Sequence, residues 1–449
     1  MHDTLTGELQ ELIPERPPRV RIYACGPTVY GRAHVGNARP FVVFSLLKRF
    51  LVHEGYDVVL VSNITDINDK IYDAAQQTGV ASAALAAEMM AAYVADTDRL
   101  GLGRPDREPL ASETIAGIVA LIESLVERGH AYAVDGDVYF SVRSDPEYGT
   151  LSHRDIERLD QGEGVQGARR KSDPRDFALW KANKPGEDTA WGSPWGRGRP
   201  GWHIECSAMA EELLGVGFEI HGGGSDLIFP HHENEAAQTR AGRGAELARL
   251  WMHNGMVRLD SEKMAKSVGN ISLLHEALDR HGPETLLTYF CSGHWRQPIE
   301  YDEQRLADAA ARAEGIRNSA RRLTAGSGPQ WSAALRERFF DALAADFNTV
   351  RALAVLAEWV GEANRATAGS VGDADLAEML DVLGLAGLMA GSASQEIPAA
   401  ASTLLRERED ARRERDWARA DALREQLTGL GWEVRDGPGG PELVRLLRI

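Results

Sequence analysis

The chain has 449 residues, 43% of them hydrophobic and 26% charged, which is enough apolar material for a large core divided over two or three domains. Its formal charge of -17 argues against a general polyanion binder, so any nucleic-acid contact must be a local patch. Three cysteines are too few for a disulfide framework.

The first residues, MHDTLTGELQELIPERPP, contain no basic start, apolar run or cleavage site, and no segment reaches membrane-spanning length. We therefore expect a cytoplasmic protein without a membrane partner. The positive charge is supplied almost entirely by arginine, since only seven of the fifty basic residues are lysine. A lysine in this chain is a hint that a compact ammonium is needed at its position.

The first 99 residues predict the first half of an α/β domain. Residues 19–25 and 57–62 alternate like strands, and residues 40–53 have helical spacing. Strand, helix and strand in this order and length indicate a βαβ unit with parallel strands. A ligand-binding loop would follow the first strand.

Residues 100–190 are predicted to interrupt this domain. Within them, AYAVDGDVYFSV reads as two short strands joined at Asp135 and Gly136, which indicates a type I′ hairpin. Strand-like runs such as 218–221 and 251–259 resume afterwards, so residues 191–300 are predicted to be the second half of the α/β domain.

The remainder of the chain predicts a helical bundle over 301–392 and a small α+β domain over 401–449. In the latter we expect one arginine-rich helix, about 403 to 428, and two short strands around a glycine turn. Ten arginines balance ten acids in 401–449, so a solvated amphipathic helix is as reasonable a reading as an RNA contact.

Two segments have features of a nucleotide site. CGPTVYGRAHVGNARP, from Cys25 to Pro40, leads from a strand into a helix and would present backbone N–H groups to a phosphate, although an ordinary loop would look the same. DSEKMAKSVGN carries Lys263 and Lys266 on a polar segment, and two ammonium groups there can close on a triphosphate. The alternative, a solvated basic loop, is weakened by the scarcity of lysine elsewhere.

A third group contains candidate metal ligands. GWHIECSAM and IHGGGSDLIFPHHENE place Cys206, His231 and Glu235 within thirty residues, and the last two are four apart at a helix start opened by Pro230. With Cys25 they would make a tetrahedral zinc site of two thiolates, one imidazole and one carboxylate. Buried cysteines and a histidine pair at a helix start are the structural alternative.

Taken together, these segments resemble known motifs. HVGN and KMAKS resemble the two ATP-binding motifs of class I aminoacyl-tRNA synthetases, usually written HIGH and KMSKS. CGPTVY, GWHIECSAM, FPHHENE and WMHNGMV resemble, in matching order, the motifs of the cysteinyl-tRNA synthetase family. The resemblance implies a Rossmann-like catalytic domain split by a connective insertion, followed by a helical bundle and an anticodon-binding-like tail.

The resemblance also implies an activity and a metal site. It implies that the chain activates cysteine with ATP and transfers it to tRNA(Cys). It implies one zinc ion held by Cys25, Cys206, His231 and Glu235, with the substrate cysteine binding zinc through its thiolate. Zinc prefers a soft sulfur to the hydroxyl of serine, so discrimination would need no editing domain. Trp202 and Asp226 are the candidates for shaping the amino-acid pocket.

For ATP, which magnesium would accompany, the resemblance implies a site formed by both motifs, with Lys266, Lys263 and His34 as the catalytic candidates. The full set of residues predicted to bind ATP is His34, Gly36, Asn37, Lys263, Met264, Lys266 and Ser267. The chain departs from the usual motifs at Asn37, in place of histidine, and at Ala265, in place of serine. The third cysteine, Cys291, lies in an apolar run and is predicted to be a core residue.

Two other functions remain open. A related ligase, which joins cysteine to a glucosamine-inositol acceptor in mycothiol synthesis, resembles the same motifs, but Glu235 and the helical domain with its tail argue against it. An inactive paralogue that binds RNA would have no reason to keep Lys263 and Lys266. If the tail reads the anticodon, Trp432, Arg435 and Asp436 are the predicted contacts. Oligomeric state, monomer or homodimer, cannot be inferred from these patterns.

Overall fold

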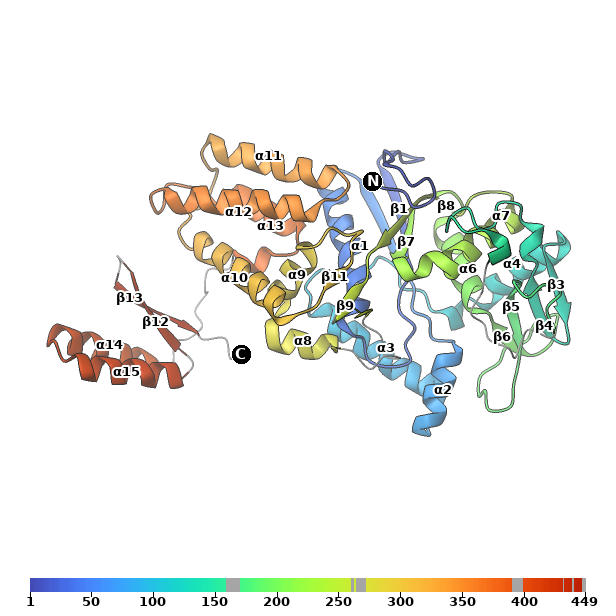
Figure 1. Ribbon diagram of the computed structural model, residues 1–449, viewed down its shortest axis with the longest axis horizontal. Helices are drawn as coiled ribbons and strands as arrows, with labels where there is room; N and C mark the ends of the chain where they lie inside the picture. The colour runs from blue at the N-terminus through green and yellow to red at the C-terminus, as the bar shows by residue number, and fades with distance from the viewer. Residues whose placement is uncertain are drawn as a thin grey trace. The chain divides into compact units, whose positions relative to one another are not determined.

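A computed structural model describes residues 1–158, 170–259, 262–263, 272–389, 399–430, 432–437 and 440–445. The chain divides into two compact units, Met1–Met389 and Ala390–Ile449 (Figure 1). In the described chain no single helix is both long and apolar enough to cross a bilayer; one bent pair, Asp69–Thr78 with Ser82–Asp98, meets that test by length and composition alone.

A parallel four-stranded sheet forms the centre of the first unit. Its strands, in the order β2-β1-β7-β8, are β2 (Asp57–Ser62), β1 (Arg19–Ala24), β7 (Phe218–Gly224) and β8 (Ala248–Asn254). Helix α1 (Val35–His53) connects β1 to β2, which confirms the predicted βαβ unit. Because β1 pairs with β7, with Ile22 opposite Ile220, segments almost 200 positions apart in sequence end side by side.

A second, antiparallel sheet lies between β2 and β7 in the sequence. It has the order β3-β4-β5-β6, formed by Ala131–Val134, Asp137–Phe140, Phe177–Ala182 and Gly198–Pro200. The β3–β4 turn has φ of 51° at Asp135 and 86° at Gly136, both positive as a type I′ turn requires, so this hairpin prediction is confirmed. Helices α2 (Asp69–Thr78), α3 (Ser82–Asp98) and α4 (Ile115–Glu127) precede it.

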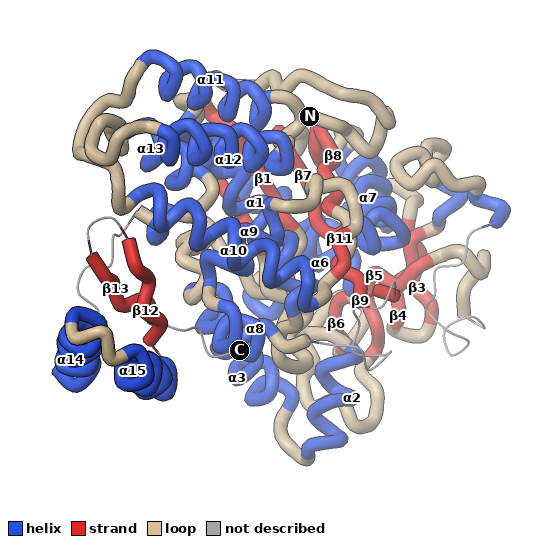
Figure 2. Tube along the Cα trace, turned by 60° about the vertical axis from the view of Figure 1, so that its left-hand side comes forward, coloured by secondary structure: helices blue, strands red, loops and turns tan. Residues whose placement is uncertain are grey.

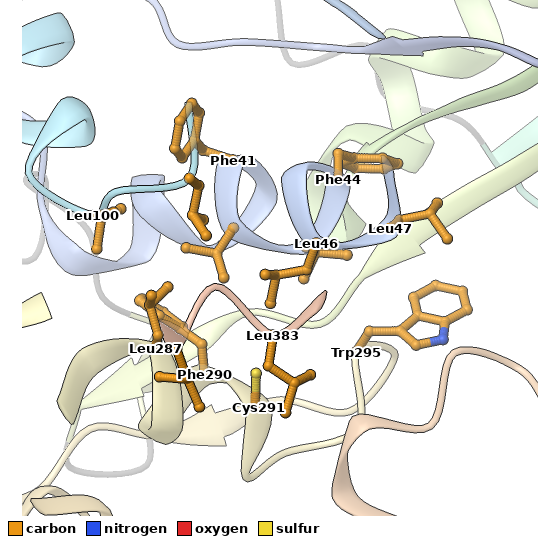
Figure 3. Close-up of a cluster of buried hydrophobic side chains, with 14 of the residues drawn as sticks. Phe41, Phe44, Leu46, Leu47, Leu100, Leu287, Phe290, Cys291, Trp295 and Leu383 are labelled. Atoms are coloured by element: carbon orange, nitrogen blue, oxygen red, sulfur yellow. The ribbon is translucent and has the colours of Figure 1, made fainter. Parts of the chain in front are cut away.

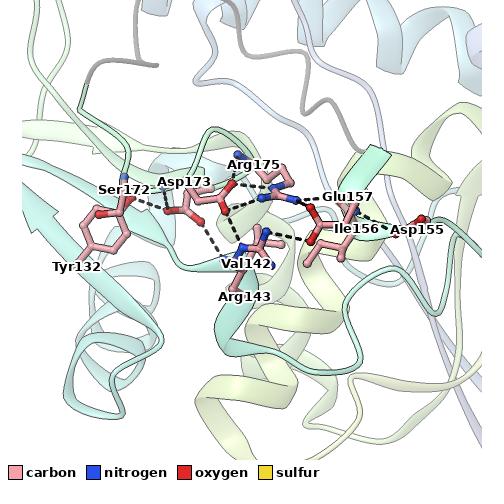
Figure 4. A network of polar contacts seen from close by, with 10 residues as sticks. Tyr132, Val142, Arg143, Asp155, Ile156, Glu157, Ser172, Asp173 and Arg175 are labelled. Atoms are coloured by element: carbon pink, nitrogen blue, oxygen red, sulfur yellow. Dashed lines mark hydrogen bonds and ion pairs between the residues drawn. The ribbon is translucent and has the colours of Figure 1, made fainter.

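An ion-pair network ties this second sheet to the segments beside it (Figure 4). Arg143 and Arg175 both donate to Asp173 and to Glu157, at 2.7–2.9 Å. These hydrogen bonds hold the pKa of Asp173 well below its usual value, with Arg175 as the largest cause. The carboxylate of Asp176 accepts hydrogen bonds from Tyr132 and from the backbone of Val142.

Helices dominate the rest of the first unit (Figure 2). Their side chains meet α1 in the main hydrophobic core, where Leu46 of α1 points toward the side occupied by Leu287 and Leu383, and Phe44 points away from it (Figure 3). Cys291 lies in this core and is 1% exposed, as predicted. The helices and remaining strands of the unit are α6 (Trp202–Leu214), α7 (Glu233–Arg243), β9 (Val257–Leu259), β10 (Glu262–Lys263), α8 (Leu274–His281), α9 (Pro283–Cys291), β11 (Ile299–Glu300), α10 (Glu303–Ala320), α11 (Gln330–Ala344), α12 (Thr349–Arg365) and α13 (Ala374–Val382).

The second unit contains a helical hairpin and a strand hairpin. The prediction of one helix over 403–428 is wrong: the chain forms α14 (Ala399–Arg413) and α15 (Trp417–Gly429). The break occurs because Arg415 adopts a positive φ of 59° and Asp416 caps α15 by accepting from the backbone of Arg419. The two predicted strands are present as β12 (Trp432–Gly437) and β13 (Gly440–Arg445).

Candidate active site and metal centre

A cavity of about 600 Å³ lies where β1 and β7 end and α1 begins. Ligands of open parallel sheets bind at this edge, beyond the carboxyl ends of the strands. The cavity wall brings together predicted residues from three separate motifs: Cys25, His34, Gly36, Asn37, Trp202 and Asp226. The predicted metal, nucleotide and amino-acid residues in this group therefore border one space.

Glycines allow the backbone to approach closely at this edge. A Cβ on Gly26 would lie 1.8 Å from the carbonyl oxygen of Asn63, so only glycine fits directly after Cys25. A Cβ on Gly223 would lie 2.9 Å from the side chain of Leu227 and 3.4 Å from His232. Because the backbone segments approach closely here, Cys25 lies next to the segment that carries His231 and His232.

Four buried side chains place their possible ligand atoms within 4.8 Å of one another: Cys25, His231, His232 and Glu235. We call this group of candidate ligands the metal cluster. Glu235 Oε1 lies 3.0 Å from His231 Nε2 and 3.6 Å from Cys25 Sγ. His232 Nε2 lies 3.3 Å from Cys25 Sγ and 3.9 Å from Glu235 Oε1. Three of the predicted ligands thus converge, and His232 joins them although the motif pattern had singled out only its neighbour.

Cys206 lies beside this cluster rather than in its tightest group. It is 1% exposed on α6, and its thiol hydrogen-bonds Cys25 and Tyr23. The hydrogen bond with Cys25 lowers the pKa of Cys206, but burial and the charges of Glu235 and Glu205 outweigh it and raise the pKa. Burial is also the main cause that raises the pKa of Cys25 well above its usual value. Both thiols therefore hold their protons unless a cation replaces them.

Burial disfavours the charged form of three imidazoles in and around the cluster. Burial lowers the pKa of His231 to about 3, and the nearby charge of Glu235 only partly opposes this. Burial likewise lowers the pKa of His203 to about 3 and the pKa of His232 well below its usual value. A neutral imidazole keeps a lone pair, which is what a metal ligand needs.

A second layer of histidines orients the inner side chains, and sequence reasoning missed it. His203 Nδ1 lies 2.9 Å from His231 Nδ1, and His221 Nε2 lies 2.9 Å from Glu235 Oε2. His221 also reaches the carbonyl oxygen of Tyr23. Such outer partners fix the orientation of metal ligands. Both histidines stand inside the quoted segments GWHIECSAM and IHGGGSDL, but nothing in those patterns distinguishes an outer partner of a metal ligand from a core histidine.

The two predicted amino-acid contacts line the cavity, and one of them touches the cluster. The indole of Trp202 stacks on the ring of His231, with centroids 4.2 Å apart and planes at 18°. Asp226 follows β7 and lines the cavity. An aromatic wall and a carboxylate beside a candidate metal centre suit a small ligand that carries both a thiol and an ammonium group.

The first nucleotide motif forms the start of α1. His34 is the residue before the helix, and its backbone N–H donates to the side chain of Asn37 at 3.1 Å. Asn37 thus closes a capping box, which gives a structural reason for asparagine at the position where the usual motif has histidine. A Cβ on Gly36 would lie 2.9 Å from the His34 ring, so a larger residue there would displace that ring.

The second nucleotide motif is only partly visible. Lys263 lies in β10, whose backbone pairs with Arg258 of β9. Met264, Ala265, Lys266 and Ser267 lie outside the described residues. The structure therefore places the start of this motif next to β9 and leaves the roles of its remaining residues as predictions.

In the second unit, the structure bears on the predicted tRNA contacts through the burial of two tryptophans. Trp432 is only 7% exposed and packs in a small core with Ala401, Leu427 and Leu443, so the prediction that its ring stacks on a base is wrong. The side chains of Arg435 and Asp436 lie outside what the structure describes. Trp417, which the sequence reading passed over, is 60% exposed at the start of α15.

Comparison with known protein families finds matches along most of the chain. The class I (C) tRNA synthetase catalytic domain matches residues 12–311, the DALR domain 338–388 and the cysteinyl-tRNA ligase anticodon binding domain 394–442. The cysteine-tRNA ligase of Pseudothermotoga lettingae is 43% identical over 98% of this chain and 97% of its own length. That of Halorhodospira halophila is 45% identical over 99% of both.

Solved structures share the fold at low identity. A Mycobacterium tuberculosis methionyl-tRNA synthetase in complex with methionyl-adenylate has a TM-score of 0.58 and 17% identity, covering 82% of this chain and 88% of its own. An Agrobacterium radiobacter LeuRS in a ternary complex with tRNA and LeuAMS has a TM-score of 0.62 and 10% identity, covering 86% of both chains. The α/β core is therefore the Rossmann-like core of class I tRNA synthetases, and by its full-length identity to curated relatives the chain belongs to the cysteine-tRNA ligase family.

Proposed function

We propose that this chain activates cysteine with ATP, transfers it to the 3′ end of tRNA(Cys), and recognises cysteine through a zinc ion held by Cys25, Cys206, His231 and Glu235. The observation that carries the proposal is the buried metal cluster at the wall of the cavity, beside the start of α1. Recognition of the thiol and binding of the nucleotide are thereby assigned to two sides of one space.

The donor atoms fit zinc. A tetrahedral ion with bonds of about 2.0 to 2.3 Å holds its ligand atoms about 3.3 to 3.8 Å apart. The separations of Glu235 Oε1 from His231 Nε2, 3.0 Å, and from Cys25 Sγ, 3.6 Å, lie close to that range. Sulfur, imidazole and carboxylate are the ligands that zinc accepts. When bound, zinc would lower the pKa of the substrate thiol and favour sulfur over the hydroxyl of serine.

Cys206 is the preferred fourth ligand, although His232 lies nearer the group. The motif resemblance assigns the fourth position to Cys206, and His232 has another role open to it, since its Nδ1 lies 2.7 Å from His253 Nε2 and its Nε2 lies 3.3 Å from Cys25 Sγ. Cys206 is hydrogen-bonded to Cys25 and feels the charge of Glu235, which places its thiol beside the group. We assign His232 to the hydrogen bond with Cys25 rather than to the metal.

The remaining roles follow from position. Trp202 closes one side of the amino-acid pocket, and Asp226 meets the α-ammonium of cysteine. His34, Gly36 and Asn37 set the N-terminus of α1 against the phosphates of ATP, where backbone N–H groups favour an anion. Lys263, Met264, Lys266 and Ser267 are assigned to the nucleotide by the motif that they form, with Lys266 on the charge that develops at the α-phosphate and magnesium accompanying the ATP.

The acceptor is a tRNA rather than a glucosamine-inositol. The match of residues 394–442 to an anticodon binding domain supports this choice, since a small acceptor needs no such domain. Within that segment, the exposed ring of Trp417 is the group we assign to stacking on an unpaired base.

The zinc assignment is tested with a pair of cysteine variants. Cys206→Ser should lose most of the bound zinc, measured by elemental analysis, together with cysteine-dependent ATP–pyrophosphate exchange. Cys291→Ser is the matched control, because Cys291 is equally buried but lies in the hydrophobic core, where burial raises its pKa to about 12. His232→Gln should keep near-stoichiometric zinc. Loss of zinc in His232→Gln but not in Cys206→Ser would transfer the fourth position to His232.

A further inference from the structure

A hydrogen-bonded chain runs from the N-terminal segment to the metal cluster. Thr4 Oγ1 lies 2.8 Å from His253 Nδ1, and His253 Nε2 lies 2.7 Å from His232 Nδ1. His232 Nε2 in turn lies 3.3 Å from Cys25 Sγ. These four groups, the Thr4–Cys25 chain, connect a half-exposed hydroxyl to a buried sulfur. None of the roles assigned above uses Thr4 or His253.

Thr4 is held in place by its backbone rather than by its hydroxyl. Its N–H donates to the carbonyl oxygen of Trp251 at 2.9 Å, and its own carbonyl oxygen lies 2.9 Å from His153 Nε2. The adjacent carboxylate of Asp3, 1% exposed, accepts from the backbone N–H of Trp251. Residues 3 and 4 thus attach to the outer edge of β8, and the hydroxyl of Thr4 remains available for the histidine.

The distances and the chemistry of the groups decide which atom donates in each hydrogen bond of the Thr4–Cys25 chain. Only one proton fits between His253 Nε2 and His232 Nδ1 at 2.7 Å, so one ring donates and the other accepts. A neutral imidazole has one donor and one acceptor nitrogen, and a thiolate accepts only. If Cys25 is a zinc-bound thiolate, His232 Nε2 donates to it, His253 Nε2 donates to His232 Nδ1, and His253 Nδ1 needs a donor. The hydroxyl of Thr4 is the donor in contact with it.

We propose that Thr4 is a positioning residue for the metal centre: by donating to His253 it selects the tautomer of His232 whose N–H is presented to the sulfur of Cys25. The proposal rests on the zinc ligation of Cys25 proposed above. An N–H directed at a metal-bound sulfur stabilises its negative charge and fixes its orientation, and loss of such an outer contact typically costs 10–100-fold in metal affinity.

The competing explanation is that Thr4 only anchors the N-terminal segment. Substitutions separate the two, because the backbone contacts of Thr4 do not depend on its side chain. Thr4→Val removes the hydroxyl while keeping the shape, and Thr4→Ser keeps the hydroxyl. Thr6→Val is the matched control, since Thr6 is exposed and its hydroxyl accepts from Glu8 and Gln10, at 3.3 Å each.

Zinc release from the full-length, zinc-loaded protein to excess chelator is the first measurement. Thr4→Val should release zinc about tenfold faster or more, while Thr4→Ser and Thr6→Val release it at the wild-type rate. The second measurement is the ¹⁵N NMR spectrum of the histidine side chains, in which wild type should carry the His253 and His232 protons on Nε2. Thr4→Val should shift His253 toward the other tautomer.

Three results would overturn the inference, and the first two are wild-type release from Thr4→Val and a proton on Nδ1 of His253 in the zinc-loaded wild type. Equal acceleration in Thr4→Ser and Thr4→Val would also overturn it, because then the hydroxyl is irrelevant. A wild-type protein that binds no zinc would instead refute the proposed metal site itself, so the two failures are distinguishable.

Discussion

Arg39 shows how one residue ties the first nucleotide motif to the segment that leads to the second. It lies on α1, is 1% exposed, and its guanidinium donates to the carbonyl oxygens of Gly255, Met256, His294 and Gln297 at 2.6–3.1 Å. Gly255 and Met256 line the cavity and directly precede β9. Burial lowers the pKa of Arg39 to about 10, which still leaves it charged at neutral pH.

Replacing the guanidinium of Arg39 should therefore affect both stability and catalysis. Arg39→Lys leaves several buried carbonyls without a donor, because an ammonium cannot reach all of them, and should lower the free energy of unfolding by about 2 to 4 kcal/mol. ATP–pyrophosphate exchange should fall as well. Arg49→Lys, on the same helix, changes a more exposed ion pair with Asp381 and should cost less than about 1 kcal/mol. Urea unfolding of both variants measures these changes. Equal losses in the free energy of unfolding would contradict the prediction.

At the scale of elements, α1 ends on a titratable contact with the helical region. His53 Nε2 lies 2.8 Å from Glu378 of α13, its Nδ1 lies 2.9 Å from Glu54, and its ring stacks on Phe340. Burial opposes the charge of His53, but the hydrogen bonds and charges of Glu378 and Glu54 outweigh it and raise the pKa above its usual value.

This contact predicts a pH dependence of stability. Because the folded pKa of His53 is raised, its stabilisation is complete below the unfolded pKa of about 6.5 and is lost as pH rises through the folded value. The difference in free energy of unfolding between wild type and His53→Gln, of order 1 kcal/mol or less, should shrink from about pH 5.5 to about pH 8.5. A difference that grows over this range would contradict the assignment.

Elements defined by local periodicity were predictable, and those defined by long-range packing were not. The β1–α1–β2 unit and the Asp135–Gly136 hairpin follow from alternation and turn chemistry within a few residues. The division between α14 and α15 depends on one capping aspartate inside an otherwise helical stretch, which periodicity does not register. Trp432 was misread because a short strand pattern does not say which face a pair of helices covers.

The same distinction applies to the candidate site. Cys25, His231 and Glu235 were predictable because their chemistry and motif context coincide, and the structure brings them together. His221, His253 and Thr4 were not, because their partners lie 14 to 249 positions away and a lone histidine in a strand has no distinctive pattern.

At the scale of the whole molecule, the division at Met389 predicts separable activities. A chain ending at Met389 should retain ATP–pyrophosphate exchange, because every residue assigned to zinc, cysteine and ATP precedes position 270, and should lose most aminoacylation of tRNA(Cys).

In the full chain, Trp417→Ala should lower kcat/KM for tRNA about tenfold or more through loss of base stacking. Leu430→Ala, another exposed apolar residue of this unit, is the control. Unchanged charging by Trp417→Ala would remove that residue from the interface.

The order of strands in the parallel sheet also has a consequence for synthesis on the ribosome. β1 and β2 emerge early, but β1 gains its other neighbour only when β7 has been made. At about 5–20 residues per second, the roughly 190 intervening residues take about 10 to 40 s to translate. During that interval the nascent chain carries an open strand edge, which is a template for pairing with other chains. Cys25 is likewise translated long before His231 and Glu235, so the proposed zinc site can assemble only when more than half of the chain exists.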